Sequence, residues 1–240
     1  KAKNMNSSSI LNYYVSSSLY NWASVTGLNS SQASLELKKL DDRFENLKKI
    51  QNVFLKCFFN SPDTENFFET LISNQKVDFS RYNYFYASYL VSLGRIDEAK
   101  QVINSSLKYY PRNLLLNQFK IDLYNNNKSN IFMFDCKNEQ HVSAEILYIT
   151  ANALSSQSML SFSNFYLNLA KYLNTDFHSY DTLLAENYYE TDNFDKAKKI
   201  YKRIRNKGGA FNWYSSKQLA RIYLKQEDQN RALNLLANAY

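Results

Sequence analysis

The densest group of potentially reactive side chains lies between residues 135 and 141. It contains residue types that bind metals or form a cysteine–histidine nucleophile: Asp135, Cys136, Glu139 and His141. A zinc site needs three or four ligands, and a nucleophilic cysteine needs a base that a third group orients. The only other histidine is His178, and nothing else along the chain offers the missing partners. We therefore expect a protein that is not an enzyme and that has neither a metal site nor a cofactor.

Two further motifs point away from chemistry. Cys57 and Cys136 are the only cysteines, and they lie in different segments without a Cys-x-x-Cys spacing, which excludes a disulfide framework and a zinc ribbon. Gly208-Gly209 is the only glycine pair. It is not followed by Lys-Ser or Lys-Thr and no strand precedes it, so we expect a bend between units and not a phosphate-binding loop.

Positive charge is concentrated near the end of the sequence. Residues 192–231 contain eleven Lys or Arg and four acidic residues, a difference of +7 that equals the formal net charge of the whole chain. Such a region attracts nucleic acid, anionic lipid or acidic peptide. For the helix expected at 194–206 we favour the simpler interpretation, a solvated basic face opposite a buried stripe of Ala197, Ile200, Tyr201 and Ile204.

The composition favours helices throughout. Four Gly and two Pro in 240 residues, with no sustained alternation of apolar and polar residues, leave little room for strands. No apolar run approaches the roughly 18 residues of a membrane-spanning helix. The chain begins with Lys and ends partway through a repeat. We therefore expect a fragment of a longer protein, and its compartment, cytoplasmic or periplasmic, stays open.

An internal repeat predicts where these helices lie. A small residue, a large residue three later and another large residue thirteen beyond that recur along the chain. The copies are Ala87, Leu90 and Ile103; Ala151, Leu154 and Leu167; Ala185, Tyr188 and Tyr201; and Ala220, Tyr223 and Leu236. This spacing is typical of a helix–turn–helix unit of about 34 residues, and such units stack side by side. We predict an all-α, right-handed solenoid of antiparallel helical hairpins, with each of the four alanines buried where two helices meet.

The whole chain is expected to form one solenoid domain, 1–240. Clear repeats are predicted at 80–113, 144–177, 178–212 and 213–240, and degenerate helical pairs at 8–40, 42–76 and 114–143. The unit at 80 and the unit at 144 are 64 residues apart, which is four short of two repeats. We infer that the unit between them has a truncated or extended second half.

The repeat resembles the tetratricopeptide repeat (TPR) family. That family places small residues at positions 8, 20 and 27, large residues at 11 and 24, and Pro at 32. In the unit that starts at Ser80 these positions hold Ala87, Ala99, Ser106, Leu90, Ile103 and Pro111. The chain departs from the family in lacking Trp at position 4, and the Pro occurs in one unit alone. It also resembles large tetratricopeptide proteins of alphaproteobacteria, so a bacterial scaffold is the implied type of protein.

The resemblance implies a binding groove lined by the first helix of each unit. Transferred to this chain, the groove holds Arg81, Tyr84, Ser88, Tyr148, Asn152, Glu186, Tyr189, Glu190, Lys217, Arg221 and Lys225. The last three follow at four-residue steps on one helix face and could grip a carboxylate or phosphate. We call Lys217, Arg221 and Lys225 the basic ladder. Glu186 and Glu190 on the preceding first helix could instead pair with the ladder and silence it, and both alternatives stay open.

A solenoid of this type is expected to bind a protein or peptide as a scaffold or adaptor, with an acidic segment as the ligand of the ladder. Two alternatives stay open: a substrate-docking arm of a larger enzyme, and an envelope or secretion assembly factor. RNA binding through the basic end is less favoured, because no residue recurs once per unit as a base-reading code. The apolar residues of the last helix are expected to pack with further repeats or to mediate self-association.

Overall fold

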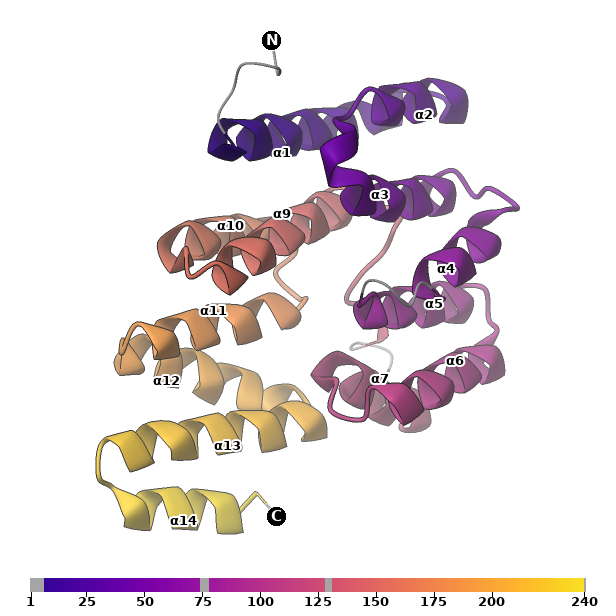
Figure 1. Cartoon of the computed structure of the whole chain (residues 1–240). Coiled ribbons are helices and arrows are strands. Elements are labelled where there is room, and N and C mark those ends of the chain that lie inside the picture. Colours follow the sequence, from indigo (N-terminus) through magenta and orange to yellow (C-terminus); the bar gives the residue numbers. More distant parts are fainter. Residues whose placement is uncertain (1–6, 74–77, 128–130, 240) are drawn as a thin grey trace.

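The computed structural model describes residues 7–73, 78–127 and 131–239, and these residues form α-helices joined by short turns, with no β-strand among them (Figure 1). The helices are α1 (Ser7–Ser24), α2 (Ser30–Lys38), α3 (Glu45–Phe58), α4 (Thr64–Ile72), α5 (Ser80–Ser92), α6 (Ile96–Tyr109), α7 (Leu114–Tyr124), α9 (Glu139–Ser156), α10 (Leu160–Leu173), α11 (Ser179–Glu190), α12 (Phe194–Ile204), α13 (Gly209–Lys225) and α14 (Gln229–Ala237). The predicted all-α solenoid of helical hairpins is confirmed.

Besides α3/α4, which has it at Asn60, four hairpins share the same turn between their two helices. These are α5/α6, α9/α10, α11/α12 and α13/α14. In each, a backbone N–H just after the turn donates to the carbonyl five residues earlier, from Arg95 to Leu90, Met159 to Leu154, Asn193 to Tyr188 and Asp228 to Tyr223, at 2.8–3.0 Å. The preceding residue has a positive φ, which is easily adopted by Gly94 but is unusual for Ser158, Asp192 and Glu227. The turn therefore repeats even where its favoured glycine does not.

The predicted small positions are buried. Ala87, Ala151, Ala185 and Ala220 are at most 2% exposed, and Ala99, Ser163, Ala197 and Ala232 in the second helices are equally covered. Because side chains this small let two helix backbones approach closely, they set the tight packing within each hairpin. The buried stripe of α12 is also as predicted.

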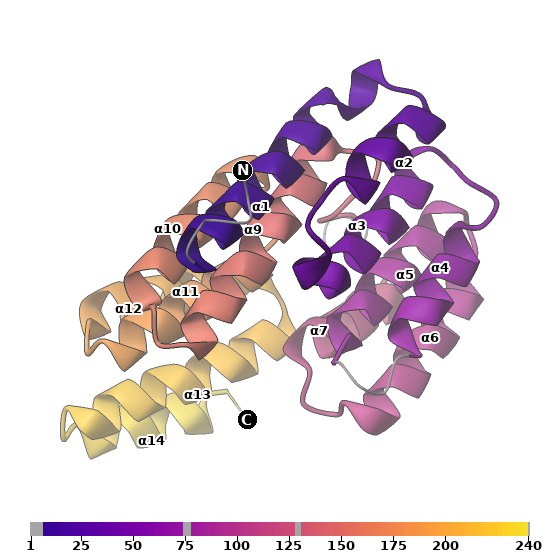
Figure 2. The same cartoon turned by 45° about the horizontal axis from the view of Figure 1, so that its top comes forward.

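The helices form two rows that lie side by side. The first row runs from α2 to α7, and the second runs from α9 to α14 (Figures 1 and 2). Helix α1 spans both rows at one end, because it packs against α9 and its Tyr14, Ser18 and Trp22 share hydrogen bonds with the buried Gln51 of α3. At the other end α7 packs against α13. The chain thus doubles back after α7, which the repeat spacing did not predict.

Contact between α7 and α13 depends on Gly208. The side-chain oxygen of Gln118 accepts a hydrogen bond from the Ala210 N–H at 3.0 Å. Gly208 has a φ of 145°, and a Cβ built there would overlap the Gln118 side chain. The glycine pair is therefore a bend, as predicted, and it also allows the two rows to meet.

The segment between α7 and α9 crosses from one row to the other. It lies within the range 114–143 for which a degenerate helical pair was expected, and α7 is the first helix of that range. Beyond α7 the apolar residues Ile131, Met133 and Phe134 are buried. The Phe134 ring contacts Phe54 of α3 and Phe85 of α5. Three expected ranges, 42–76, 114–143 and 213–240, include residues 74–76, 128–130 and 240, which lie outside the described residues.

The same crossing brings the two cysteines together. Cys57 and Cys136 form a disulfide with a Cα–Cα distance of 5.9 Å, a pairing that their position in different segments did not indicate when a disulfide framework was excluded. The reason is the doubling back of the chain, which places residue 136 beside α3 although 79 residues separate the two cysteines. Disulfides persist in oxidising compartments and are rare in the reducing cytosol. No described helix has the length and apolar character needed to cross a membrane.

The hairpin packing yields a first prediction. Replacing the fully buried Ala185 by Leu should overpack the α11–α12 contact and lower the free energy of unfolding by about 1–3 kcal/mol, measured by urea denaturation. Ala153, which is exposed on α9, provides the matched control, because Ala153→Leu adds the same atoms without a neighbour to displace. Equal stabilities of the two variants would show that the small positions do not limit the packing.

Candidate partner-binding groove

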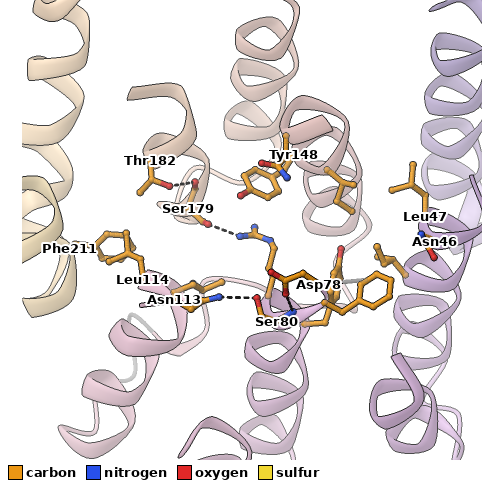
Figure 3. A pocket seen from close by; sticks show the side chains of 17 residues that line it. Asn46, Leu47, Asp78, Ser80, Asn113, Leu114, Tyr148, Ser179, Thr182 and Phe211 are labelled. Atoms are coloured by element: carbon orange, nitrogen blue, oxygen red, sulfur yellow. Dashed lines mark hydrogen bonds between the residues drawn. The ribbon is translucent and has the colours of Figure 1, made fainter. Parts of the chain in front are cut away.

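A cavity of about 480 Å³ lies between the two rows (Figure 3). Tyr148 of α9 and Ser179 and Thr182 of α11 line it from the second row, and Asn46 and Leu47 of α3 line it from the first. The first turns of α3, α5, α7, α11 and α13 all contribute to its wall. Helix N-termini carry partial positive charge, so this wall favours polar and anionic groups over cations.

An ion pair joins the two rows at the wall of this cavity. Arg81 of α5 donates from Nε and Nη2 to the two carboxylate oxygens of Glu145 of α9, at 2.7 and 2.8 Å. Its Nη1 donates to Ser179 Oγ at 2.6 Å. Glu145 is completely buried, and the Arg81 side chain is 16% exposed. The guanidinium also stacks on Tyr148, 3.9 Å from the ring centre. Arg81 therefore connects α5, α9 and α11.

Burial and charge act against each other in this pair. Burial raises the pKa of the Glu145 carboxyl above its ordinary value, and the charge and hydrogen bonds of Arg81 offset part of that rise. Burial is the largest single influence on the pKa of Arg81 and lowers it, but the charge and hydrogen bonds of Glu145 together with the neighbouring Tyr148 and Tyr180 outweigh burial and raise that pKa. The guanidinium thus stays charged, and its positive charge compensates the negative charge of the buried Glu145 carboxylate.

The structure divides the predicted groove residues into two groups. Arg81, Tyr148 and Asn152 line the cavity together, as expected for a groove. Tyr84 and Ser88 do not line it. Tyr84 is completely buried, so the expectation that it faces a groove is wrong, and Ser88 lines a second cavity beside the crossing segment. Tyr84 packs against Phe119 of α7 and Phe177, and Ser88 lies against the crossing segment near Ile131. The crossing segment and α7 cover this part of α5.

The remaining predicted residues continue the cavity along the second row. Thr182, Glu186 and Glu190 follow at four-residue steps on α11, so they extend from the cavity along one helix face. The basic ladder lies on the neighbouring helix α13. We use the term groove face for the surface of α9, α11 and α13 made by Tyr148, Asn152, Thr182, Glu186, Tyr189, Glu190, Lys217, Arg221 and Lys225.

The ladder rests on an aromatic ring. The Arg221 guanidinium lies 4.5 Å and the Lys225 ammonium 4.8 Å from the centre of the Tyr189 ring. Lys225 also pairs with the exposed Asp192 at 3.4 Å. All three ladder residues are exposed, whereas Tyr189 beneath them is buried. The ring holds the cations in place by attraction to its face without neutralising them.

The two glutamates of α11 do not neutralise the ladder. Glu186 accepts a hydrogen bond from the Tyr214 hydroxyl. Over the described residues, no ion pair joins Glu186 or Glu190 to a ladder residue. Burial raises the pKa of Glu186, while the Tyr214 hydrogen bond and the charge of Arg221 oppose the rise. The ladder therefore keeps most of its positive charge available to a ligand.

The other groups singled out in the sequence have structural partners. His141 Nδ1 accepts a hydrogen bond from the Asp135 N–H at 3.0 Å, and Cys136 is in the disulfide. No group of three or more metal-ligating side chains occurs in the described part of the chain. On α12, Arg203 binds Asp181 and Lys198 binds Asp195, whereas Lys199 and Lys202 are exposed. The basic face of α12 is thus solvated, as expected.

Sequence reasoning missed Glu145 and Ser179. Glu145 stands among Ser143, Ala144, Ile146 and Leu147, all buried in α9. A lone acidic residue within a run of small and apolar residues is the signal that could have marked it, because such a charge needs a buried partner. Nothing in the sequence indicated that the partner would be Arg81, 64 positions earlier.

Comparison with known proteins adds no closer assignment. No protein-family model matches the chain, and no curated protein is similar to it. Among solved structures, MamA is 14% identical over 73% of this chain and 84% of its own, with a TM-score of 0.37. PilF of Pseudomonas aeruginosa is 12% identical over 95% and 89%, with a TM-score of 0.33. IFIT1, in complex with m7Gppp-AAAA, is 14% identical over 98% and 50%, also at 0.33. At TM-scores this low the matches do not establish a common fold.

Glu186 provides a prediction about pH. Because its pKa is raised in the folded protein, the folded state binds more protons than the unfolded state above the ordinary glutamate pKa of about 4.3, and stability falls as pH rises. Glu186→Gln removes this loss, so the variant should be more stable than the wild type at neutral pH and equal to it in acid. Urea denaturation at a series of pH values measures the difference. Glu227→Gln, at an exposed position outside the groove face, is the control. If Glu186→Gln makes the protein less stable at neutral pH, the assignment is contradicted.

Proposed function

We propose that the protein is a non-catalytic scaffold and that its groove face binds an extended segment of a partner protein with acidic side chains. The observation that carries the proposal is the basic ladder. Lys217, Arg221 and Lys225 are exposed on one face of α13, and two of them are held over Tyr189. Cations arranged in this way can form charge-assisted hydrogen bonds to a carboxylate without first breaking ion pairs to α11.

The rest of the groove face favours a peptide as the ligand and not a small anion. The ladder spans about 12 Å, since a helix rises about 1.5 Å per residue. Tyr148 and Asn152 lie at the cavity, on α9, and Glu186 lies between them and the ladder on α11. A ligand that contacts both ends must therefore cross three helices. A segment with acidic residues at one end and apolar or polar residues at the other fits this order of side chains.

Peptide selection tests the proposal without a known partner. Phage-displayed random peptides would be selected on the whole chain, and the affinity of a synthetic selected peptide would be measured by fluorescence anisotropy. We expect selected sequences rich in Asp and Glu, with binding that weakens as salt is added. Lys217→Glu with Arg221→Glu should weaken binding by about a hundredfold or more, because two hydrogen bonds between charged groups are lost.

The matched control is Lys199→Glu with Lys202→Glu on α12. It makes the same change of charge on exposed lysines outside the groove face, so it should leave the affinity within about twofold, apart from long-range electrostatic effects. Peptides without acidic residues, or equal loss of affinity in the two double variants, would refute the ladder as the binding site. Circular dichroism confirms that both variants keep their helices.

A further inference from the structure

Large apolar side chains form an exposed stripe along α10. Met159 precedes the helix, and Phe162, Phe165, Leu169 and Tyr172 follow at steps of three or four residues. Their exposed fractions are 39%, 60%, 58%, 38% and 83%. The opposite face of α10 is buried through Ser163, Leu167 and Ala170. A helix that packs with one face normally directs polar residues to solvent. The stripe departs from this pattern, and exposed apolar patches of this kind mark interaction sites.

Basic residues occupy the same positions in the next hairpin. Thirty-four residues after Phe162, Phe165 and Leu169, helix α12 has Lys196, Lys199 and Arg203. Lys202 is exposed beside them. Helix α10 itself contains no acidic residue, and its single charged residue is Lys171. The apolar stripe therefore adjoins a helix whose exposed face is mainly basic, with Asp195 as its exposed acidic residue.

The structure places the two helices next to each other. Lys171 of α10 and Arg203 of α12 both bind the carboxylate of the buried Asp181. Figure 2 shows α10 and α12 along the same outer edge of the second row. The stripe and the cations thus form one continuous surface, which we call the outer face: Phe162, Phe165, Leu169, Tyr172, Lys199 and Lys202.

We propose that the outer face binds the surface of an anionic lipid bilayer. Phe and Leu side chains of an interfacial helix enter the boundary between headgroups and acyl chains, and neighbouring lysines are attracted to anionic headgroups. The aromatic residues of the stripe are each exposed over more than half of their area, so their rings are free to insert into the bilayer interface. The groove residues lie on α9, α11 and α13 instead, so both surfaces can be occupied at once.

Charge distinguishes a membrane from the other possible occupants. A second copy of this chain would bring together two molecules that each carry a formal charge of +7, which opposes association through this face. Single-stranded nucleic acid is bound by aromatic residues set within a basic groove. Here the aromatic residues lie on α10 and the exposed lysines on α12, so the two kinds of side chain belong to separate helices. An apolar stripe on one helix beside basic residues on the next suits a planar, anionic and partly apolar partner.

Vesicle co-sedimentation tests the proposal with the whole chain. Vesicles of phosphatidylcholine alone would be compared with vesicles of equal parts phosphatidylcholine and phosphatidylglycerol. We expect binding to the anionic vesicles that falls as salt is added. Phe162→Ser with Phe165→Ser should weaken it about tenfold, because apolar area is no longer inserted. Lys199→Glu with Lys202→Glu should weaken it by more than about tenfold through repulsion from the headgroups. Should the serine variant fail to fold, Tyr172→Ser, at the most exposed position of the stripe, replaces it.

Two controls separate this surface from the rest of the molecule. Tyr20→Ser with Tyr109→Ser removes aromatic residues that are 74% and 80% exposed elsewhere, and it should bind vesicles like the wild type. Lys217→Glu with Arg221→Glu changes the groove ladder and should also bind vesicles, so failure of one site does not imply failure of the other. Four results would overturn the proposal: no preference for anionic vesicles, no effect of either outer-face variant, tighter binding of oligothymidylate, or a dimer in ultracentrifugation that the Phe162 and Phe165 changes dissociate.

Discussion

The buried ion pair between Arg81 and Glu145 determines how the two rows of helices can meet. Glu145 is completely buried, and a carboxylate in that position is tolerated only with a charged and hydrogen-bonded partner. That partner comes from α5, in the other row, and reaches α9 only because the chain doubles back after α7. The disulfide, the packing of α1 on α9 and the cavity between the rows all follow from the same geometry.

This arrangement gives the second row two surfaces of different character. Helix α13 carries the basic ladder, two of whose cations lie over Tyr189, and the cavity lies at the other end of the groove face. The second helices carry cations in open solvent beside an apolar stripe. Charge near a wall of protein is less screened than charge in open solvent, so the ladder is suited to a specific ligand. The outer cations are suited to a broad charged surface, where many weak contacts add.

Local features of the fold were predictable, and features that depend on distant segments were not. The buried alanines and the stripe of α12 follow from spacing within single hairpins. The turns at Asp192 and Glu227 gave no signal, because their positive φ belongs to a motif that usually selects glycine. The surroundings of Tyr84, Ser88 and Cys57 could not be predicted, because residues 119, 131, 177 and 136, which lie far along the chain, pack against them. The helix faces of α9, α11 and α13 that carry the proposed groove residues follow from the repeat spacing, because neighbouring hairpins place these helices.

A double-mutant cycle on Arg81→Met and Glu145→Leu measures whether the two rows depend on this contact. Each single variant leaves one buried charge without its partner, so each should lower the free energy of unfolding by about 3–5 kcal/mol. The double variant removes both charges, and its loss should be far smaller than the sum of the single losses. Strictly additive losses would mean that the two side chains do not meet, and a chain that doubles back between α7 and α9 would then be the wrong description of the protein.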